Sequence, residues 1–368
     1  MQVLNQTRHV TQFTMGMDKA GREFLSLVVK GTWDFPPPGQ TVPAPAAVPR
    51  PLVMADEFTG APGFSATRWE TDFAFRKPHP EVILQGAAYA PGGAPAERVR
   101  VGIMVGHWSK QFDVVGPREW RVLGPSIGAT RPYPFQRLAF SYDTAFGGVD
   151  RSVPDNPEPG AYRLNPHGLG YAEVSGRSQL SGLPLPLTED PADPVTSPYG
   201  SYRPMAFGPV FRGHPDRLRW AGTYDEDWEA NVFPFLPADF DDRYYQSTLP
   251  DQWLPAAPDP GTPVVIRNLT PSGREEFRLP DTVLPIRVFR GRETCLEGRF
   301  RPDTLIFDTE ARQLMMLWRV AVPMRRIITE FTEAWIGPPT PAMLRARAAG
   351  KRYVRAVLTE RDLEDEEA

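Results

Sequence analysis

Two groups of carboxylates lie close together in this sequence and could do acid–base chemistry. They are Asp225, Glu226 and Asp227, followed by Asp239, Asp241 and Asp242. Two such groups could supply the general acid and the base of a glycoside hydrolase. The stretch 220–253 around them holds nine aromatic residues and no lysine. Its aromatic side chains could stack on sugar rings, so a carbohydrate-active or carbohydrate-binding protein is one hypothesis.

The same carboxylates also have an architectural interpretation. Acidic residues beside prolines and tyrosines commonly cap turns and helices or pair with arginine, and Arg217, Arg219 and Arg243 are near in the sequence. The segment DEDW is typical of the acidic first turn of a short helix, with Asp225 or Thr223 as the N-cap. A partner-binding surface is the third interpretation of this stretch.

Other chemical motifs are missing from the sequence. The five histidines are scattered and the one cysteine, Cys295, has no partner, whereas a structural zinc site needs about four closely spaced ligands. We find no Gly-x-Ser-x-Gly nucleophile elbow and no phosphate-binding glycine loop. The sequence therefore predicts no catalytic residue set, no metal and no cofactor.

Composition limits the class of protein and its partners. The 368 residues include 31 glycines and 43 prolines, and the formal net charge is −4. So many helix-breaking residues favour short strands joined by turns and long loops. The charge does not indicate nucleic-acid binding. The sequence has no secretory signal and no run of about 18 apolar residues that suggests a membrane span. We therefore expect a cytoplasmic protein with no nucleic-acid or membrane partner.

The strand pattern places these groups on a β scaffold. Residues 21–35 read as a strand with Val10–Met15 as its hairpin partner, and 99–105 pairs with 110–115. Residues 124–254 are loop-rich, but their aromatic content favours order. Short helices are expected at 325–334 and 341–349. The expected fold is mainly β, with antiparallel, sandwich-like sheets, long ordered loops and short C-terminal helices.

Several short motifs follow one another along the chain. They are VILQGAAYAPGG, SYDTAFGG, NPHGLG, PMAFGP, AGTYDEDW, PFLPADFDDRYYQ, PDQW and LMMLWRVAVP. In number and order they resemble an uncharacterised-domain family encoded in bacterial type VI secretion clusters, beside genes for PAAR and VgrG spike proteins and toxic effectors. The resemblance covers roughly residues 1–335. It implies one adaptor-like domain, or two β subdomains at 1–123 and 255–335 joined by 124–254. Residues 336–368 would form a helical extension and an acidic tail.

The resemblance also implies a function. Members of that family are regarded as non-enzymatic adaptors or chaperones that bind an effector and help to load it onto the PAAR/VgrG spike. A structural component of the spike is a further possibility. Phe146 and Glu81 depart from the family pattern, which usually has tyrosine and aspartate there. The pattern residues, structural or binding, are Tyr142, Asp143, Phe146, Gly147, Gly148, Asn165, Gly168, Gly222, Thr223, Tyr224, Asp225, Trp228, Asp239, Asp241, Arg243, Asp251 and Gln252.

Overall fold

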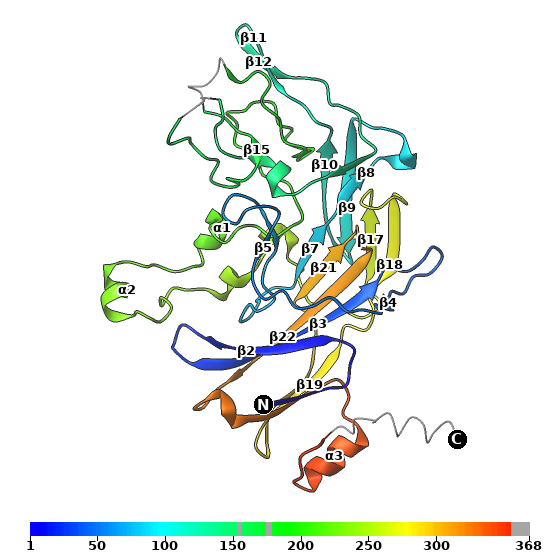
Figure 1. Cartoon of the computed structure of the whole chain (residues 1–368), viewed down its shortest axis with the longest axis vertical. Coiled ribbons are helices and arrows are strands. Elements are labelled where there is room, and N and C mark those ends of the chain that lie inside the picture. The colour runs from blue at the N-terminus through cyan, green and yellow to red at the C-terminus, as the bar shows by residue number, and fades with distance from the viewer. Residues whose placement is uncertain (153–155, 174–178, 355–368) are drawn as a thin grey trace. The chain divides into compact units, whose positions relative to one another are not determined.

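The computed structural model describes residues 1–152, 156–173 and 179–354 (Figure 1). The expected acidic tail lies mostly outside them. The chain is mainly β with few short helices, which confirms the expected fold class. Its described residues divide into two compact units, one built on 8–284 and 300–325, the other on 1–7, 285–299 and 326–354. No helix in the described ranges is long and apolar enough to cross a membrane.

The larger unit is built on a sheet in the order β2-β3-β22-β21-β7, with β4 paired to β3. Ten consecutive residues of β3 are buried, as expected for a central strand covered on both faces. The predicted β2–β3 hairpin is confirmed, whereas β7 and β21 pair in parallel. The strands are β2 (Val10–Met17), β3 (Glu23–Asp34), β4 (Ala44–Pro45), β7 (Glu81–Gln85), β21 (Thr304–Asp308) and β22 (Gln313–Pro323).

A second sheet in this unit has the order β16-β10-β9-β17-β18. Buried and exposed residues alternate along β9, because one face of that strand packs against the core. The predicted β9–β10 hairpin is confirmed. The strands are β9 (Arg98–Val105), β10 (Trp108–Val115), β16 (Thr188–Glu189), β17 (Pro263–Arg267) and β18 (Arg274–Arg278).

The long loops of the larger unit are ordered by small paired strands and short helices. Phe146 and Trp120 belong to a buried cluster among these loops, together with Tyr202, Leu180 and Leu185. The paired strands are β5 (Glu57–Phe58) with β6 (Thr67–Trp69), β8 (Ala87–Tyr89) with β13 (Arg137–Ala139), β11 (Trp120–Leu123) with β12 (Ser126–Ala129), and β14 (Phe146–Gly147) with β15 (Leu169–Gly170). The helices are α1 (Pro215–Leu218), α2 (Glu226–Asn231), η1 (Pro91–Gly93), η2 (Tyr142–Thr144), η4 (Asp242–Tyr245) and η5 (Pro250–Gln252).

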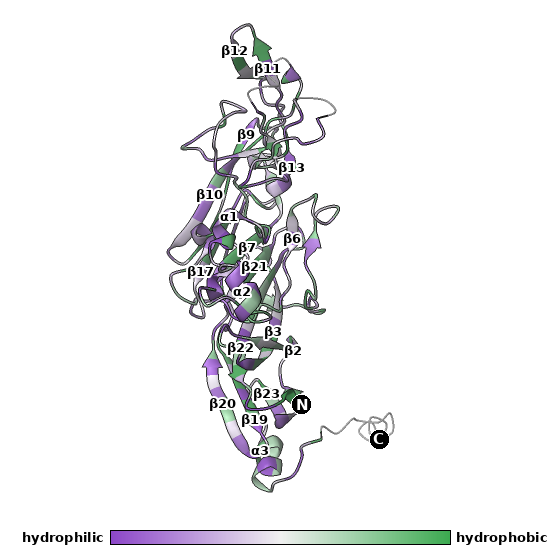
Figure 2. Ribbon diagram, turned by 90° about the vertical axis from the view of Figure 1, so that its left-hand side faces the viewer, coloured by the Kyte–Doolittle hydropathy of each residue, from purple (hydrophilic) through white to green (hydrophobic). Residues whose placement is uncertain are grey.

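The smaller unit is a sheet in the order β1-β23-β19-β20 with one helix, α3. Leu4, Phe289, Trp335 and Met343 form its core. Along β20 hydrophilic and hydrophobic residues are mixed, as Figure 2 shows, because this strand lies at the edge of the sheet. The elements are β1 (Gln2–Asn5), β19 (Leu284–Arg290), β20 (Glu293–Phe300), η6 (Ile328–Glu330), β23 (Phe331–Ile336) and α3 (Pro341–Ala348).

Of the two helices expected near the C-terminus, one is present and the other is replaced by a strand. Thr340 caps α3 by accepting a hydrogen bond from the Met343 amide, and Pro341 occupies the first helical turn, as predicted. The helix predicted at 325–334 is wrong. Residues 331–336 form β23, which pairs with β1 in parallel and with β19 in antiparallel orientation. Pairing with segments distant in the sequence overrides the local pattern.

Candidate functional site

A loop around α2 extends away from the sheets of the larger unit, and we call residues 221–241 the α2 projection (Figure 1). Its helix begins as the sequence predicted. The Asp225 carboxylate accepts a hydrogen bond from the Trp228 amide at 2.9 Å, and Glu226 and Asp227 occupy the first turn. Negative charge there is stabilised by the helix dipole. A short acidic segment can therefore form a helix although it has little contact with the core.

The projection is closed at its base by Asp239 and Gly222. The Asp239 carboxylate accepts hydrogen bonds from the Thr223 amide at 3.0 Å and from the Thr223 hydroxyl at 2.8 Å. The hydrogen bond from the Thr223 amide is the main cause of the lowered pKa of Asp239. Gly222 has φ +86°, and a Cβ there would lie 2.9 Å from Pro237 Cβ. Only glycine suits both the conformation and the close approach.

Aromatic side chains cover the projection and remain largely open to solvent. The Trp228 ring contacts Tyr224 and Phe233 edge to face, with centroids 4.7 and 5.7 Å away. The Trp228 indole also donates to the Phe235 carbonyl at 2.9 Å, which fixes its orientation. Tyr224 is 53% exposed and Phe233 is 66% exposed. Rigid, exposed aromatic groups of this kind are typical anchors in protein interfaces.

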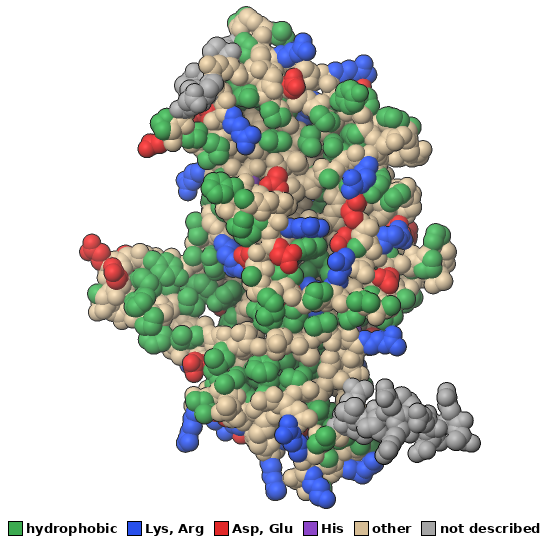
Figure 3. Space-filling model, in the orientation of Figure 1, with side chains coloured by type: hydrophobic (Ala, Val, Ile, Leu, Met, Phe, Trp, Pro, Cys, Tyr) green, Lys and Arg blue, Asp and Glu red, His purple; other side chains and the backbone are tan. Residues whose placement is uncertain are grey.

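The α2 projection is also strongly acidic. Its residues 221–241 contain six carboxylates and neither lysine nor arginine. Glu226, Asp227 and Glu229 are exposed, and Figure 3 shows acidic side chains at the outer end of a projection covered by hydrophobic groups. This combination favours contact with a partner that is apolar and positively charged.

The carboxylates considered for catalysis hold turns together. Asp227 accepts from the Asn231 amide group at 2.7 Å. Asp241 caps η4 and pairs with Arg243 at 2.7 Å, and this arginine lowers the pKa of Asp241 to about 2. Asp242 lies 3.4 Å from Arg76. Burial raises the pKa of Asp242, and the charge of Arg76 opposes that shift. This geometry gives no support to a pair of carboxyl groups facing each other across a cleft.

The structure joins the motifs SYDTAFGG and NPHGLG. The Asn165 amide group donates to the carbonyls of Tyr142 at 2.7 Å and Phe146 at 3.1 Å. Gly147 and Gly148 have positive φ, and a Cβ on Gly147 would overlap the Asn165 carbonyl. Gly168 is equally crowded, since a Cβ there would come within 2.5 Å of the Asn165 amide nitrogen. These pattern residues therefore hold two loops against each other.

Asp143 ties the same region to the segment before β6. Its carboxylate accepts from the Ala66 amide at 2.7 Å and from the Thr59 hydroxyl at 2.6 Å. It also accepts from Ser141, which in turn caps η2. This carboxylate is thus occupied by local hydrogen bonds.

Asp251 and Gln252 lock η5 onto the sheets. The Gln252 amide group donates to the carbonyls of Val82 at 2.7 Å and Phe207 at 2.9 Å, and its oxygen accepts from Lys110 at 2.7 Å. Asp251 pairs with Lys110 at 2.8 Å. Burial lowers the pKa of Lys110, and Asp251 opposes that shift. The PDQW motif is therefore a buried attachment point.

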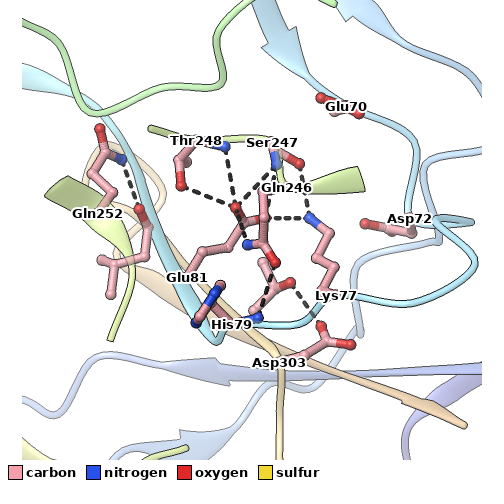
Figure 4. A network of polar contacts seen from close by, with 12 residues as sticks. Glu70, Asp72, Lys77, His79, Glu81, Gln246, Ser247, Thr248, Gln252 and Asp303 are labelled. Atoms are coloured by element: carbon pink, nitrogen blue, oxygen red, sulfur yellow. Dashed lines mark hydrogen bonds and ion pairs between the residues drawn. The ribbon is translucent and has the colours of Figure 1, made fainter. Parts of the chain in front are cut away.

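A buried polar network around Glu81 was not predicted from the sequence (Figure 4). The fully buried Glu81 carboxylate pairs with Lys77 and accepts from the amides of Ser247 at 3.0 Å and Thr248 at 3.1 Å. Burial alone would raise the pKa of Glu81, but the charge of Lys77 and the hydrogen bonds outweigh it and lower that pKa. Its partner Ser247 is 166 residues away. No local spacing could have revealed this network.

Residues 1–152, 156–173 and 179–354 contain no group of three or more histidine, cysteine, aspartate or glutamate side chains placed to hold a metal ion.

These features define a mainly β scaffold with an aromatic, acidic projection. The chain belongs to the family described as "Uncharacterized protein conserved in bacteria (DUF2169)", whose model matches residues 20–319. No curated protein and no solved structure matches it. The match includes every pattern residue named above, and its description assigns no function.

Proposed function

We propose that this chain is a non-enzymatic adaptor or chaperone that binds a type VI secretion effector in the bacterial cytoplasm. It would stabilise the effector and assist its loading onto the PAAR/VgrG spike. The ordered motifs that resemble the secretion-cluster family support the biological setting. One observation supports binding: the α2 projection exposes aromatic anchors on a closed, buttressed loop.

The rest of the geometry fits a binding role. The pattern residues at 142–148 and 165–168 tie two loops together, and those at 251–252 tie η5 to the sheets. Such ties reduce the conformational entropy that a loop loses when it binds a partner. Preorganised loops on a rigid scaffold are a common basis for protein recognition. A carbohydrate-binding role is less well supported, because Trp228 is already packed edge to face against two aromatic neighbours.

The test is capture of the effector encoded beside this gene. Purified full-length chain is immobilised, and its affinity for that effector is measured for the wild type and for Tyr224→Ala/Phe233→Ala. We expect the double variant to bind at least about tenfold more weakly, since interface aromatic anchors are worth about 2 kcal/mol or more each. In bacteria, deleting the gene should abolish secretion of the effector.

A matched control uses two exposed aromatic residues outside the projection. Phe64 is 86% exposed and Tyr133 is 74% exposed, so Phe64→Ala/Tyr133→Ala removes the same side-chain types. This variant should bind the effector as the wild type does. Equal binding by all three proteins would reject the α2 projection as the docking surface, and unchanged effector solubility and secretion after gene deletion would reject the adaptor function.

A further inference from the structure

The smaller unit contains a cavity of about 820 Å³ that the proposed function does not use. The turn between β19 and β20, strand β23 and the end of α3 form its walls. Four cationic side chains line it: Arg292 from the turn, Arg347 from the last turn of α3, and Lys351 and Arg352 just after that helix. Its volume is in the range of small-molecule sites, about 300–1,000 Å³.

Positive charge in this cavity has little compensation. Its lining includes one carboxylate, that of Glu333. Glu333 accepts a hydrogen bond from the Trp335 indole at 2.8 Å and lies 3.9 Å from the Arg347 guanidinium. The Glu333 carboxylate therefore already has partners in the cavity wall, and its charge balances at most one of the four cations.

Two of the cationic groups, those of Arg347 and Arg352, are held in place by the fold. The Arg347 guanidinium lies 3.5 Å from the centre of the Phe289 ring and donates to the Arg292 carbonyl at 2.9 Å. Arg352 donates to the side chain of Gln2 at 2.7 Å. Gly350 has φ +66°, and a Cβ there would lie 2.8 Å from a terminal nitrogen of Arg292. The Arg292 side chain thus packs directly against the backbone that carries Lys351.

Stabilisation of the helix end does not explain all of these cations. Positive side chains are favoured near a helix C-terminus, where they offset the helix dipole and bind free carbonyls. Here the last carbonyls of α3 already accept from backbone amides. Those of Ala346 and Arg347 bind the amides of Lys351 and Gly350 at 2.8 and 2.9 Å. Arg292 and Lys351 remain as like charges gathered around one cavity, an arrangement that an anion would relieve.

We propose that this cavity binds a small polyanion that carries two or more phosphate groups. Guanidinium groups match phosphate with two parallel hydrogen bonds, and several fixed cations suit a ligand with adjacent phosphates. Three of the four cations lie beyond residue 319, where the family match ends. The site is thus a property of the C-terminal part of this chain and does not depend on the α2 projection.

Isothermal titration of the full-length chain with inorganic triphosphate, pyrophosphate and orthophosphate in 0.15 M salt tests the proposal. We expect saturable binding of triphosphate and pyrophosphate, with orthophosphate at least about tenfold weaker because it contacts fewer cations. Arg292→Gln/Lys351→Gln should weaken triphosphate binding about tenfold or more. Lys351→Gln alone, at an exposed position, should weaken it in the same direction without affecting the fold.

The control keeps the net charge of the double variant. Arg299 in β20 and Arg345 in α3 are exposed and lie outside the cavity lining, so Arg299→Gln/Arg345→Gln should bind triphosphate like the wild type. Equal loss in both double variants, or no binding by the wild type, would overturn the proposal. Binding seen only after residues 355–368 are removed would also overturn it, because the acidic C-terminal segment would then be the occupant. Effector capture by Arg292→Gln/Lys351→Gln should stay unchanged.

Discussion

Arg217 and Glu70 form a buried, two-point ion pair at the base of the α2 projection. The two guanidinium nitrogens lie 2.7 and 3.0 Å from the two carboxylate oxygens, and the Arg217 side chain is completely buried. The same guanidinium donates to the carbonyls of Val210 and Tyr244. One side chain thereby joins α1, the segment after β6 and helix η4. This contact holds the chain just before the α2 projection begins.

Replacing Arg217 should destabilise the protein strongly. Arg217→Met leaves the carboxylate of Glu70 and two carbonyls without this donor, and we expect a loss of about 3 kcal/mol in the free energy of unfolding. Arg212, which lies 3.2 Å from Glu70, limits the loss. Urea denaturation measures it.

The controls separate burial from charge. Arg219 is 53% exposed and pairs loosely with Asp216 at 3.7 Å, so Arg219→Met should change stability by at most about 1 kcal/mol. Arg217→Met/Glu70→Leu should recover part of the stability, because no unpaired charge then remains buried. If Arg217→Met and Arg219→Met were equally stable, the buried ion pair of Arg217 would not be important for the stability of the fold.

Gly222 should be required at the neck of the projection for two separable reasons. Gly222→Ala places a Cβ at positive φ and 2.9 Å from Pro237 Cβ. We expect a destabilisation of about 2–3 kcal/mol, together with faster proteolysis within residues 221–241. Gly39 has nearly the same φ, +85° against +86°, but nothing lies within 4 Å of its Cβ position. Gly39→Ala should therefore cost only about 1 kcal/mol, and equal costs would show that the contact with Pro237 is unimportant.

Interactions between residues that are close together in the chain leave a signal in the local sequence. The β2–β3 and β9–β10 hairpins and an N-cap of α2 at Asp225 or Thr223 were predicted, because each depends on residues close together in the chain. The strand β23 was predicted as a helix because its partners, β1 and β19, lie far away in the sequence.

Buried polar contacts were the least predictable part of the site. Arg217 and Glu70 are 147 residues apart, and Glu81 and Thr248 are 167 apart. In the sequence such residues look like ordinary surface charges, since lysine, arginine and glutamate are rarely fully buried unless paired. The sequence indicated that the stretch 220–253 is unusually acidic and aromatic. Only the structure shows that buried polar contacts hold the chain at its two ends.

Glu81 should make the stability of the protein depend on pH. Its pKa is lower in the folded chain than in the unfolded chain, so its carboxylate stabilises the fold above the unfolded value of about 4.3. That contribution is lost as the pH falls below this value toward the lower pKa of the folded state. Unfolding free energies measured at pH 7, 5 and 3 should decrease in that order.

The variant Glu81→Gln tests the origin of this dependence. It leaves Lys77, whose side chain is 2% exposed, without its anion, and should cost about 3–5 kcal/mol at pH 7. The remaining decrease between pH 5 and pH 3 should be smaller than in the wild type. Glu57 is exposed on β5, and Glu57→Gln should keep the wild-type profile. An unchanged profile in Glu81→Gln would assign the acid sensitivity to other carboxylates.

Under the proposed adaptor function, the acidic residues of the α2 projection should control the rate of effector binding more than the final affinity. Charges of one sign at the rim of an interface speed the encounter with a partner of opposite charge. Salt screens this attraction. Glu226→Gln/Glu229→Gln should therefore slow association roughly threefold or more at low salt, with a small effect on dissociation. Stopped-flow measurements at 0.05 and 0.5 M salt test this.

Glu57→Gln/Glu158→Gln, at exposed positions outside the projection, should associate like the wild type. If association is equally fast in both variants at low salt, the acidic surface does not guide the partner and the aromatic anchors act alone.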